Sequence, residues 1–370
     1  MANTRPALPI PGDLAVRIGV ARETKEGEKR VALGPAHVSL LAAEGHDVRV
    51  ERGAGAGIGV PDAAYRAAGA RIVSAGEAWA GDLVVKVKEV QPGEIALVKA
   101  GPALFGYQHL AGEPEMTRAL AARGATAIAF ELVRDERGGY PLLAPMSVIA
   151  GRMAVEAAAR ILGDAAREVL VLGAGHAGLS AARAARDRGA RVAVLTRSEA
   201  SRDAARRELG PAVECGIATA HAIERHALAA DLVVGAVFIA GTPTPKLLPR
   251  ALVARMRRGS VIADISIDAG GVAETSRPTT HAEPTFVEEG VVHYCVPNIP
   301  AADALASAAA LGDALLPFVR EIAARGIEAA VRANAALAAG VVLWRGQAAH
   351  RGIAQEAGLP YTPLFASGSP

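Results

Sequence analysis

The segment Glu168-Val-Leu-Val-Leu-Gly-Ala-Gly-His-Ala-Gly178 decides the fold of this chain. Its first five residues form a nearly continuous apolar run, which is typical of a strand in the centre of a parallel sheet. Gly173, Gly175 and Gly178 then follow in the spacing GxGxxG, and residues 179–188 continue with a helical pattern. A strand, this glycine pattern and a helix, in that order, predict a dinucleotide-binding βαβ unit. The glycines would make the turn, admit a pyrophosphate and allow close helix–strand packing, respectively.

The end of the next expected strand, 191–195, indicates which dinucleotide is bound. In such domains an acidic residue at this point accepts hydrogen bonds from the adenosine ribose of NAD. Here Thr196 and Arg197 follow the strand, and Arg202 lies one helical turn beyond. A guanidinium suits a 2′-phosphate because it offers charge-assisted, bidentate donors. We therefore expect NADP(H) to be preferred, with NAD(H) as the alternative if Arg197 only points to solvent.

Strands alternate with helical stretches along both halves of the chain, which predicts βαβ units and mainly parallel sheets. Apolar runs typical of strands occupy residues 15–20, 47–51, 83–87, 127–130, 168–172, 191–195, 232–236 and 261–265. The expected fold class is α/β, with two Rossmann-like domains and a cleft between them. Long helices are expected over 147–162, with Ser147 as the N-cap, and over 311–326.

The length and composition fit a two-domain globular protein. A chain of 370 residues is too long for one ordinary core. Hydrophobic residues make up 51% and charged residues 21%, so the chain can bury a substantial core and is not intrinsically disordered. A net charge of +2 gives no drive towards nucleic acids or anionic membranes. Neither kind of partner is therefore expected.

We expect neither a metal site nor a membrane span. Cys215 and Cys295 stand far apart without metal-ligand spacing, so both are expected to be reduced thiols in the cytoplasm. The apolar run 304–319 contains Asp313 and Pro317, which argues against a membrane helix.

Four polar residues in glycine-rich or apolar settings form the candidate reacting centre: Arg30, Lys88, His109 and Asp268. The last three follow expected strands, and ligands in open α/β sheets collect beyond the carboxyl ends of strands. A 2-oxo acid or amino acid needs cations for its carboxylate, a donor to its reacting oxygen or nitrogen, and a base. Each residue also has a structural interpretation: a single histidine is often a core residue, and Lys86 or Lys88 is expected at the surface.

Seven stretches resemble the alanine dehydrogenase family, which shares its fold with the nucleotide-binding subunit of proton-translocating transhydrogenase. They occur in the family's order between about residue 17 and about residue 365. They are Arg17-Ile-Gly-Val-Ala-Arg-Glu-Thr-Lys25, Lys29-Arg-Val-Ala32, Lys86-Val-Lys-Glu89, His109-Leu-Ala111, Leu142-Leu-Ala-Pro-Met-Ser147, Asp264-Ile-Ser-Ile-Asp-Ala-Gly-Gly271 and Ser276-Arg-Pro-Thr-Thr280.

The resemblance implies a substrate domain built from both chain ends, with the dinucleotide-binding domain inserted between them. The corresponding boundaries are a leader at 1–15, a substrate domain at 16–141 plus 320–370, and a dinucleotide-binding Rossmann domain at 142–319. It also implies reversible oxidative deamination of L-alanine to pyruvate and ammonia, typically with NAD. The expected assembly is a homo-oligomer, either a hexamer or a dimer.

Carried over by position, the resemblance implies a role for each candidate residue. Arg30 and Lys88 would hold the carboxylate and carbonyl of the substrate. His109 would be the acid/base, and Lys88 would help to polarise the reacting carbon. Asp268 would position or activate water or ammonia. Ser147 would lie near the cofactor at the domain junction.

The chain departs from the family pattern around these groups. Thr196 replaces the family's acidic residue, and a glycine-rich loop usually found before the GxGxxG strand is absent around 164–168. The segment 301–310, which follows the expected cofactor contact Asn298, is rich in alanine where the family has polar residues near the nicotinamide. Gln108 stands where an apolar residue is usual. The pattern favours the same hydride chemistry with a different substrate or cofactor.

Three functions remain open at this point. The first is an NADP-preferring amino-acid dehydrogenase or reductive aminase. The second is an NADPH-dependent imine reductase that joins an amino acid to a 2-oxo acid, as carboxyethyl-amino-acid synthases do. The third is a dinucleotide-binding subunit or sensor without chemistry of its own.

Overall fold

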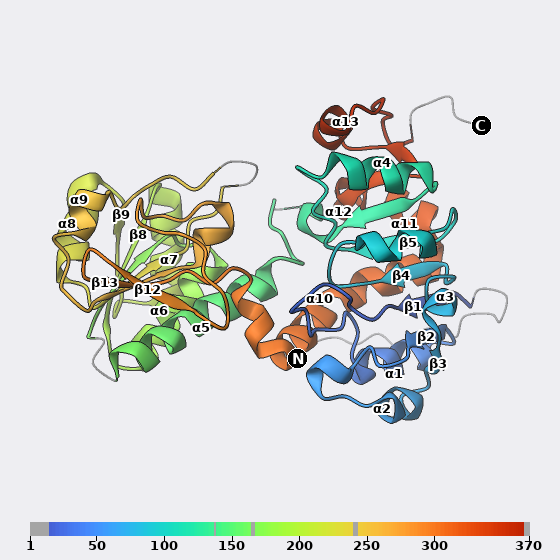
Figure 1. Cartoon of the computed structure of the whole chain (residues 1–370), viewed down its shortest axis with the longest axis horizontal. Coiled ribbons are helices and arrows are strands. Elements are labelled where there is room, and N and C mark those ends of the chain that lie inside the picture. Colours follow the sequence, from blue (N-terminus) through green and yellow to red (C-terminus); the bar gives the residue numbers. More distant parts are fainter. Residues whose placement is uncertain (1–14, 137, 164–166, 240–242, 366–370) are drawn as a thin grey trace. The chain divides into compact units, whose positions relative to one another are not determined.

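A computed structural model describes residues 15–136, 138–163, 167–239 and 243–365 of the chain. The chain divides into two compact units (Figure 1). Unit 1 contains the described residues up to Pro145 and those from Asp303 onward, and unit 2 is Met146–Ala302. Both units contain a mainly parallel sheet with flanking helices, so the expected α/β class with two Rossmann-like domains is confirmed.

Unit 1 contains an eight-stranded sheet in the order β15-β14-β6-β5-β4-β1-β2-β3. Six parallel strands have the Rossmann order 3-2-1-4-5-6. Two strands from the C-terminal part extend the sheet in antiparallel fashion at the β6 edge. The strands are β1 (Arg17–Val20), β2 (Asp47–Glu51), β3 (Arg71–Val73), β4 (Leu83–Val85), β5 (Ala103–Gly106), β6 (Thr126–Ala129), β14 (Val341–Trp344) and β15 (Gln347–Ala348).

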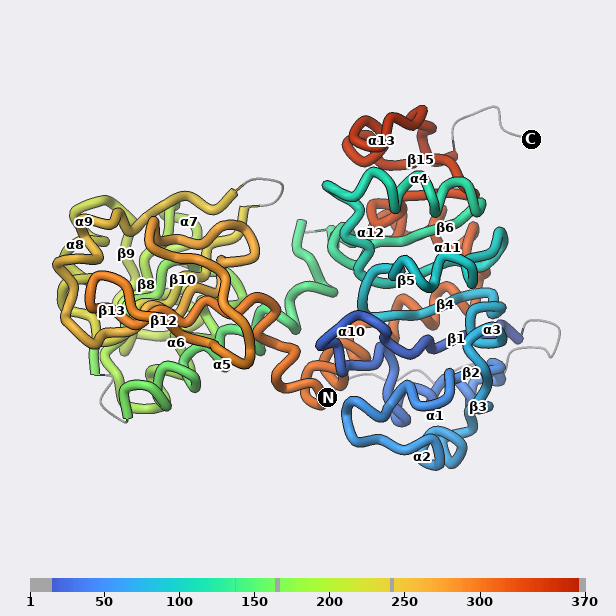
Figure 2. The backbone as a smooth tube through the Cα atoms, in the orientation of Figure 1, coloured from blue at the N-terminus to red at the C-terminus, as the bar shows by residue number. Residues whose placement is uncertain are grey.

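Helices flank this sheet and are drawn from both ends of the chain, as the tube in Figure 2 shows. Large apolar side chains, including Tyr65, Phe105 and Phe130, are fully buried in the unit. The helices are α1 (Pro35–Ala43), α2 (Asp62–Ala67), α3 (Ala75–Ala78), α4 (Pro114–Ala122), α10 (Ala304–Arg325), α11 (Ile327–Ala333), α12 (Ala335–Gly340) and α13 (Arg351–Ala357), with 3-10 turns η2 (Ala56–Ile58), η3 (Pro92–Leu97) and η4 (Phe130–Leu132).

Unit 2 contains a seven-stranded sheet in the order β12-β13-β11-β10-β7-β8-β9. All neighbouring strands are parallel except β12 and β13. The strands are β7 (Glu168–Leu172), β8 (Arg191–Thr196), β9 (Glu214–Ile217), β10 (Leu232–Gly235), β11 (Val261–Asp264), β12 (Thr285–Glu288) and β13 (Val291–Tyr294). The helices are α5 (Ala144–Leu162), α6 (His176–Asp187), α7 (Glu199–Leu209), α8 (Ala220–Ala229) and α9 (Arg250–Val253), with 3-10 turns η5 (Ile265–Ala269) and η6 (Ile299–Asp303).

The structure differs from the sequence-based boundaries at two helices. Helix α5 begins at Ala144, so Ser147 lies in its first turn and is not its N-cap. Helix α10 begins at Ala304, seven residues before the expected start at Leu311, and belongs wholly to unit 1, whereas the expected dinucleotide-binding domain continued to residue 319. The reason is packing, because α10 buries apolar residues such as Leu311 and contacts α1, η2 and α11. Nearly all of the expected leader 1–15 lies outside the described residues.

Among the described residues, one segment, Ile299–Arg325, is long and apolar enough to cross a membrane by length and composition, and its most apolar stretch of 18 residues has a mean hydropathy of 1.4. In the structure 44% of its most apolar stretch is buried. Leu311, Leu315 and Val319 are among the residues that it buries. Core helices of soluble proteins share this length and apolar composition.

Candidate functional site

Arg30 lies in the loop after β1, where it forms a buried ion pair with Glu28. Its Nε donates to Glu28 Oε1 at 2.7 Å and its Nη2 donates to Oε2 at 2.6 Å. The side chains are 2% and 1% exposed. Burial raises the pKa of Glu28, but the hydrogen bonds and charge of Arg30 outweigh this and bring it below its ordinary value. The guanidinium is therefore held in a fixed orientation beside an ionised carboxylate.

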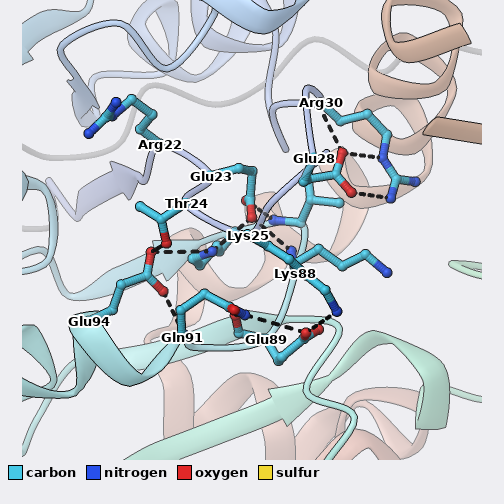
Figure 3. Close-up of polar contacts among 12 residues, drawn as sticks. Arg22, Glu23, Thr24, Lys25, Glu28, Arg30, Lys88, Glu89, Gln91 and Glu94 are labelled. Carbon is cyan, nitrogen blue, oxygen red and sulfur yellow. Dashed lines mark hydrogen bonds and ion pairs between the residues drawn. The ribbon is translucent and has the colours of Figure 1, made fainter. Parts of the chain in front are cut away.

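Lys88 lies three residues beyond the end of β4, which ends at Val85, two residues earlier than the expected strand 83–87. Within the described part of the chain, its Nζ makes no hydrogen bond or ion pair; it lies 5.8 Å from the centroid of the Tyr107 ring. Burial lowers the pKa of Lys88, and the nearby charges of Arg30 and Lys25 lower it further. Figure 3 shows Lys88 among the polar contacts that include Glu28–Arg30 and Glu89. This ammonium is available to a ligand.

Lys86 corrects the expectation that one lysine of this pair lies at the surface. Its side chain is 5% exposed, and its Nζ donates to Glu23 Oε2 at 2.7 Å. The same Glu23 carboxylate accepts the backbone N–H groups of Val87 and Lys88. Glu23 therefore fixes the loop that carries Lys88, and Lys86 supplies the positive charge that this buried carboxylate needs as a partner.

His109 lies three residues beyond β5 and has a positive φ of 45°. Its Nδ1 is 2.9 Å from Glu89 Oε2, and its backbone N–H donates to Glu131 Oε1 at 2.7 Å. Its ring lies parallel to that of Tyr107 with a centroid separation of 5.7 Å. The side chain is 46% exposed, so the imidazole is accessible to a ligand and is not a core residue.

Three of the four sequence-predicted reacting residues thus gather in unit 1 around Tyr107. Tyr107 is buried, donates from its hydroxyl to the Leu142 carbonyl at 2.8 Å, and interacts electrostatically with Arg30. Arg30 follows β1 and Lys88 follows β4, which are the neighbouring strands at which the strand order of the sheet reverses. Ligands in open α/β sheets bind at this switch point.

Sequence reasoning missed the acidic residues of this cluster. Glu28, Glu89 and Glu131 orient Arg30 and His109, yet none was singled out from the sequence. Glu28 stands two residues before Arg30 and Glu89 directly follows Lys88, and this proximity was the available signal.

In unit 2 the GxGxxG loop has the geometry of a dinucleotide-binding turn. Gly173 has φ 107°, and a Cβ there would lie 2.3 Å from the Ala236 carbonyl oxygen. A Cβ at Gly178 would lie 2.0 Å from the Gly173 carbonyl oxygen, so both positions exclude a side chain. A Cβ at Gly175 would contact nothing within 4 Å, which leaves the backbone at the start of α6 open to a ligand. Such a helix N-terminus favours a phosphate.

Alanine variants of Gly175 and Gly178 are expected to differ in their effects on dinucleotide binding and on stability. Gly175→Ala is expected to leave the melting temperature nearly unchanged, since φ −80° suits alanine. It should weaken dinucleotide binding about tenfold or more, because the methyl group occupies the space of the pyrophosphate (about 1.4 kcal/mol). Gly178→Ala should instead destabilise unit 2 by about 1–3 kcal/mol through overpacking. Calorimetry with and without the dinucleotide checks both, and equal behaviour of the two variants would contradict the assignment.

The other expected cofactor contacts also lie in unit 2. Thr196 is buried at the end of β8, and Arg197 is exposed. Within the described residues the Arg197 guanidinium has no hydrogen bond or ion pair, whereas Arg202 pairs with Asp203 at 2.9 Å. Ser147 is half-buried in α5, and Asn298 adopts a positive φ of 51° just before η6.

Asp268 is exposed in η5, four residues beyond β11, and so belongs to unit 2 rather than to the cluster around Tyr107. The buried Asp264 fixes this loop: its Oδ2 accepts from the Val272 N–H at 2.8 Å and the Ser276 hydroxyl at 2.6 Å. Lys246 donates to carbonyl oxygens of the same loop, including that of Ala273. Across the described residues, no group of three or more His, Cys, Asp or Glu side chains is arranged to hold a metal ion.

Family models and related sequences of the alanine dehydrogenase family match this protein over most of its length. The family model described as "Alanine dehydrogenase/PNT, N-terminal domain" matches residues 19–150, and "Alanine dehydrogenase/PNT, C-terminal domain" matches residues 146–351. The alanine dehydrogenase of Halomonas elongata is 42% identical over 363 residues, covering 94% of this chain and 98% of that protein. The alanine dehydrogenase of Mycobacterium tuberculosis is 40% identical over 364 residues, with the same coverage.

Solved structures show the same likeness. An L-alanine dehydrogenase superposes with a TM-score of 0.87 at 39% identity, covering 92% of this chain and 98% of that chain. A transhydrogenase from Sinorhizobium meliloti superposes with a TM-score of 0.79 at 27% identity, covering 90% of this chain and 99% of that chain. The resemblance stated from the sequence motifs is confirmed.

Proposed function

The chain belongs to the alanine dehydrogenase/PNT family, and we propose on that premise that it interconverts a small L-amino acid, L-alanine first, with its 2-oxo acid and ammonia. The observation that carries the proposal is the grouping of Arg30, Lys88 and His109 around Tyr107 in unit 1. This is an oxidoreductase reaction at a CH–NH2 group. It takes place with a nicotinamide dinucleotide.

The glycine loop of unit 2 fits such a dinucleotide, because Gly173 and Gly178 exclude side chains while the backbone at Gly175 stays open. These three residues would hold the pyrophosphate, and Ser147 and Asn298 would contact the nicotinamide end. The bound group would supply a hydride acceptor at C4 of the nicotinamide for amino-acid oxidation and a hydride donor in the reverse direction.

The residues of unit 1 would bind the acid and move its protons. Arg30, pre-oriented by Glu28, would hold the substrate carboxylate through charge-assisted hydrogen bonds. Lys88 would donate to an oxygen of the substrate and stabilise negative charge on it. In the oxidative direction His109 would take a proton from the water that adds to C2 and return one to the departing ammonia. Asp268 would orient this water or ammonia.

A steady-state comparison tests the proposal. NADH and NADPH oxidation is measured with pyruvate and other 2-oxo acids, first with ammonia and then with ornithine or lysine as the amine. Activity with pyruvate and ammonia supports the dehydrogenase. Faster oxidation with the diamines would favour the enzyme that joins an amino acid to a 2-oxo acid. A chain that binds the dinucleotide but turns over no acid would favour a sensor or binding subunit.

NADP(H) as the preferred cofactor is part of the proposal, supported by the exposed Arg197 after β8. Arg197→Ala is expected to raise the KM for NADPH about 10- to 100-fold and to leave that for NADH nearly unchanged, because a charged hydrogen bond contributes about 1.5–3 kcal/mol. Arg183→Ala is the matched control, since that arginine pairs with Glu208. If the wild-type enzyme prefers NADH and Arg197→Ala changes neither KM, NAD(H) is the cofactor.

The cytoplasmic location and the homo-oligomer, either a hexamer or a dimer, also belong to this proposal. Both are supported by the family membership, and the cytoplasmic location is supported also by the two buried free thiols, Cys215 and Cys295. Light scattering on the purified protein measures the oligomer size directly.

A further inference from the structure

The surroundings of His109 contain a carboxylate that the reaction scheme does not use. Glu89 Oε2 is 2.9 Å from Nδ1 of His109, and Glu89 Oε1 forms an ion pair with Lys25. The amide nitrogen of Gln91 donates to the backbone carbonyl of Glu89 at 2.9 Å. The Glu89 side chain is 19% exposed, and its carboxylate contacts both the solvent-exposed Lys25 and the imidazole of His109. Figure 3 shows Lys25 and Glu89 together among these contacts.

We propose that Glu89 is a positioning residue for His109 and that Lys25, by pairing with Glu89, controls the charge of the His109 imidazole. Glu89 fixes the imidazole with the proton on Nδ1, so that Nε2 is the atom that exchanges a proton with the substrate. Lys25 partly neutralises the carboxylate and so limits how strongly Glu89 favours the imidazolium. The inference rests on the function proposed above and adds the residues that set the protonation of its acid/base.

The tautomer follows from the contact itself. An ionised carboxylate is only an acceptor, so a 2.9 Å contact requires a proton on Nδ1. Burial raises the pKa of Glu89, but the hydrogen bonds from His109 and Lys25 outweigh it and bring the pKa well below its ordinary value. Glu89 therefore remains an acceptor at neutral pH. The positive φ of His109 and the stacking on Tyr107 fix the remaining orientation of the ring.

The charged and titratable groups around the imidazole come from several segments. Glu89 contacts the ring directly, and Glu131 accepts the backbone N–H of His109 from η4. Lys88 and Arg30 carry positive charge near the stacked Tyr107, and the Arg30 charge is paired with Glu28. Among the described residues, the Lys25–Glu89 pair alone combines direct contact with the ring and exposure to solvent, the lysine side chain being 41% exposed.

The experiment compares pH profiles of kcat/KM for pyruvate amination. In this direction His109 acts as the general acid and must carry its proton, so activity falls as the pH rises past a break in the profile. In Glu89→Gln the carboxylate no longer favours the imidazolium, so the break is expected about one pH unit lower. In Lys25→Gln the carboxylate is no longer neutralised, so the break is expected about half a unit higher. The shifts are opposite in sign, which general damage to the fold would not produce.

Two further readouts separate positioning from structure. Glu89→Gln is expected to lower kcat about 10- to 100-fold with little change in the KM for pyruvate, because the amide can donate to Nδ1 and select the wrong tautomer. Glu89→Asp, which keeps the carboxylate, should bring the break back towards the wild-type pH. Asp82→Asn is the matched control. Asp82 is paired with Arg17 at the amino-terminal ends of β4 and β1, away from the carboxyl ends that the cluster follows, so this variant should leave the profile unchanged.

Each outcome decides the question. Opposite shifts in the two variants support the inference. Profiles that coincide with wild type in an active enzyme overturn it and leave the proposed function intact. If Glu89→Gln fails to fold, an unshifted Lys25→Gln profile alone overturns the inference. A wild-type enzyme without activity on pyruvate and ammonia, or on any other 2-oxo acid tested, instead removes the proposed function on which it rests.

Discussion

Replacing His109 by alanine is expected to lower turnover about 10²- to 10⁴-fold, the usual contribution of a general acid/base. The imidazole is 46% exposed and is oriented by Glu89 and by the stacked Tyr107, so the reacting proton would pass through this one group. The measurement is kcat with pyruvate, ammonia and the preferred dinucleotide at saturating concentrations.

The control for this prediction is a second histidine outside the cluster. His221 is exposed on α8 in unit 2, and His221→Ala should retain wild-type turnover. Dinucleotide binding should be unchanged in both variants, because the glycine loop lies in unit 2. Near-normal turnover of His109→Ala would remove His109 from the acid/base role and shift attention to Lys88.

Replacing Arg30 by methionine is expected to destabilise unit 1 by about 3–5 kcal/mol, since it leaves Glu28 ionised and buried without its partner. The partner carboxylate is only 1% exposed, so water cannot substitute for the guanidinium. Both tryptophans of the chain, Trp79 and Trp344, lie in unit 1, so their fluorescence during urea unfolding reports on that unit alone.

A double variant separates the structural role of Arg30 from its binding role. In Arg30→Met/Glu28→Met neither charge is left unpaired, and most of the stability should return. The affinity for the 2-oxo acid should not return, because the cation that holds its carboxylate is still missing. Recovery of both stability and substrate affinity would contradict the assignment of Arg30 as a substrate ligand.

The structural features that were predicted best from the sequence are those formed by residues that are neighbours in the chain. The strand, the glycine spacing and the helix from 168 to 188 are local, and the structure has them in place as β7, the turn and α6. The structure also brings the candidates Arg30, Lys88 and His109 together around Tyr107. They follow strands of one parallel sheet, and the carboxyl ends of such strands lie at one edge.

Pairings between distant residues could not be predicted. Lys86 stands beside Lys88 in the sequence, but its partner Glu23 is far along the chain and is placed by the pairing of β1 with β4. The contact between Glu89 and His109 likewise requires β4 and β5 to be neighbours. The start of α10 was missed because its alanine-rich first turns lack the apolar periodicity that marks a packed helix.

The construction of unit 1 from both chain ends has a consequence during synthesis on the ribosome. Unit 2 is continuous, so its whole sheet can form once Ala302 has emerged. The first six strands of unit 1 are translated earlier, but β6 must wait for its neighbour β14, which is made after the whole of unit 2. We expect the nascent chain to carry a folded unit 2 while an edge of the earlier sheet is still uncovered, which is the stage at which chaperones would bind it.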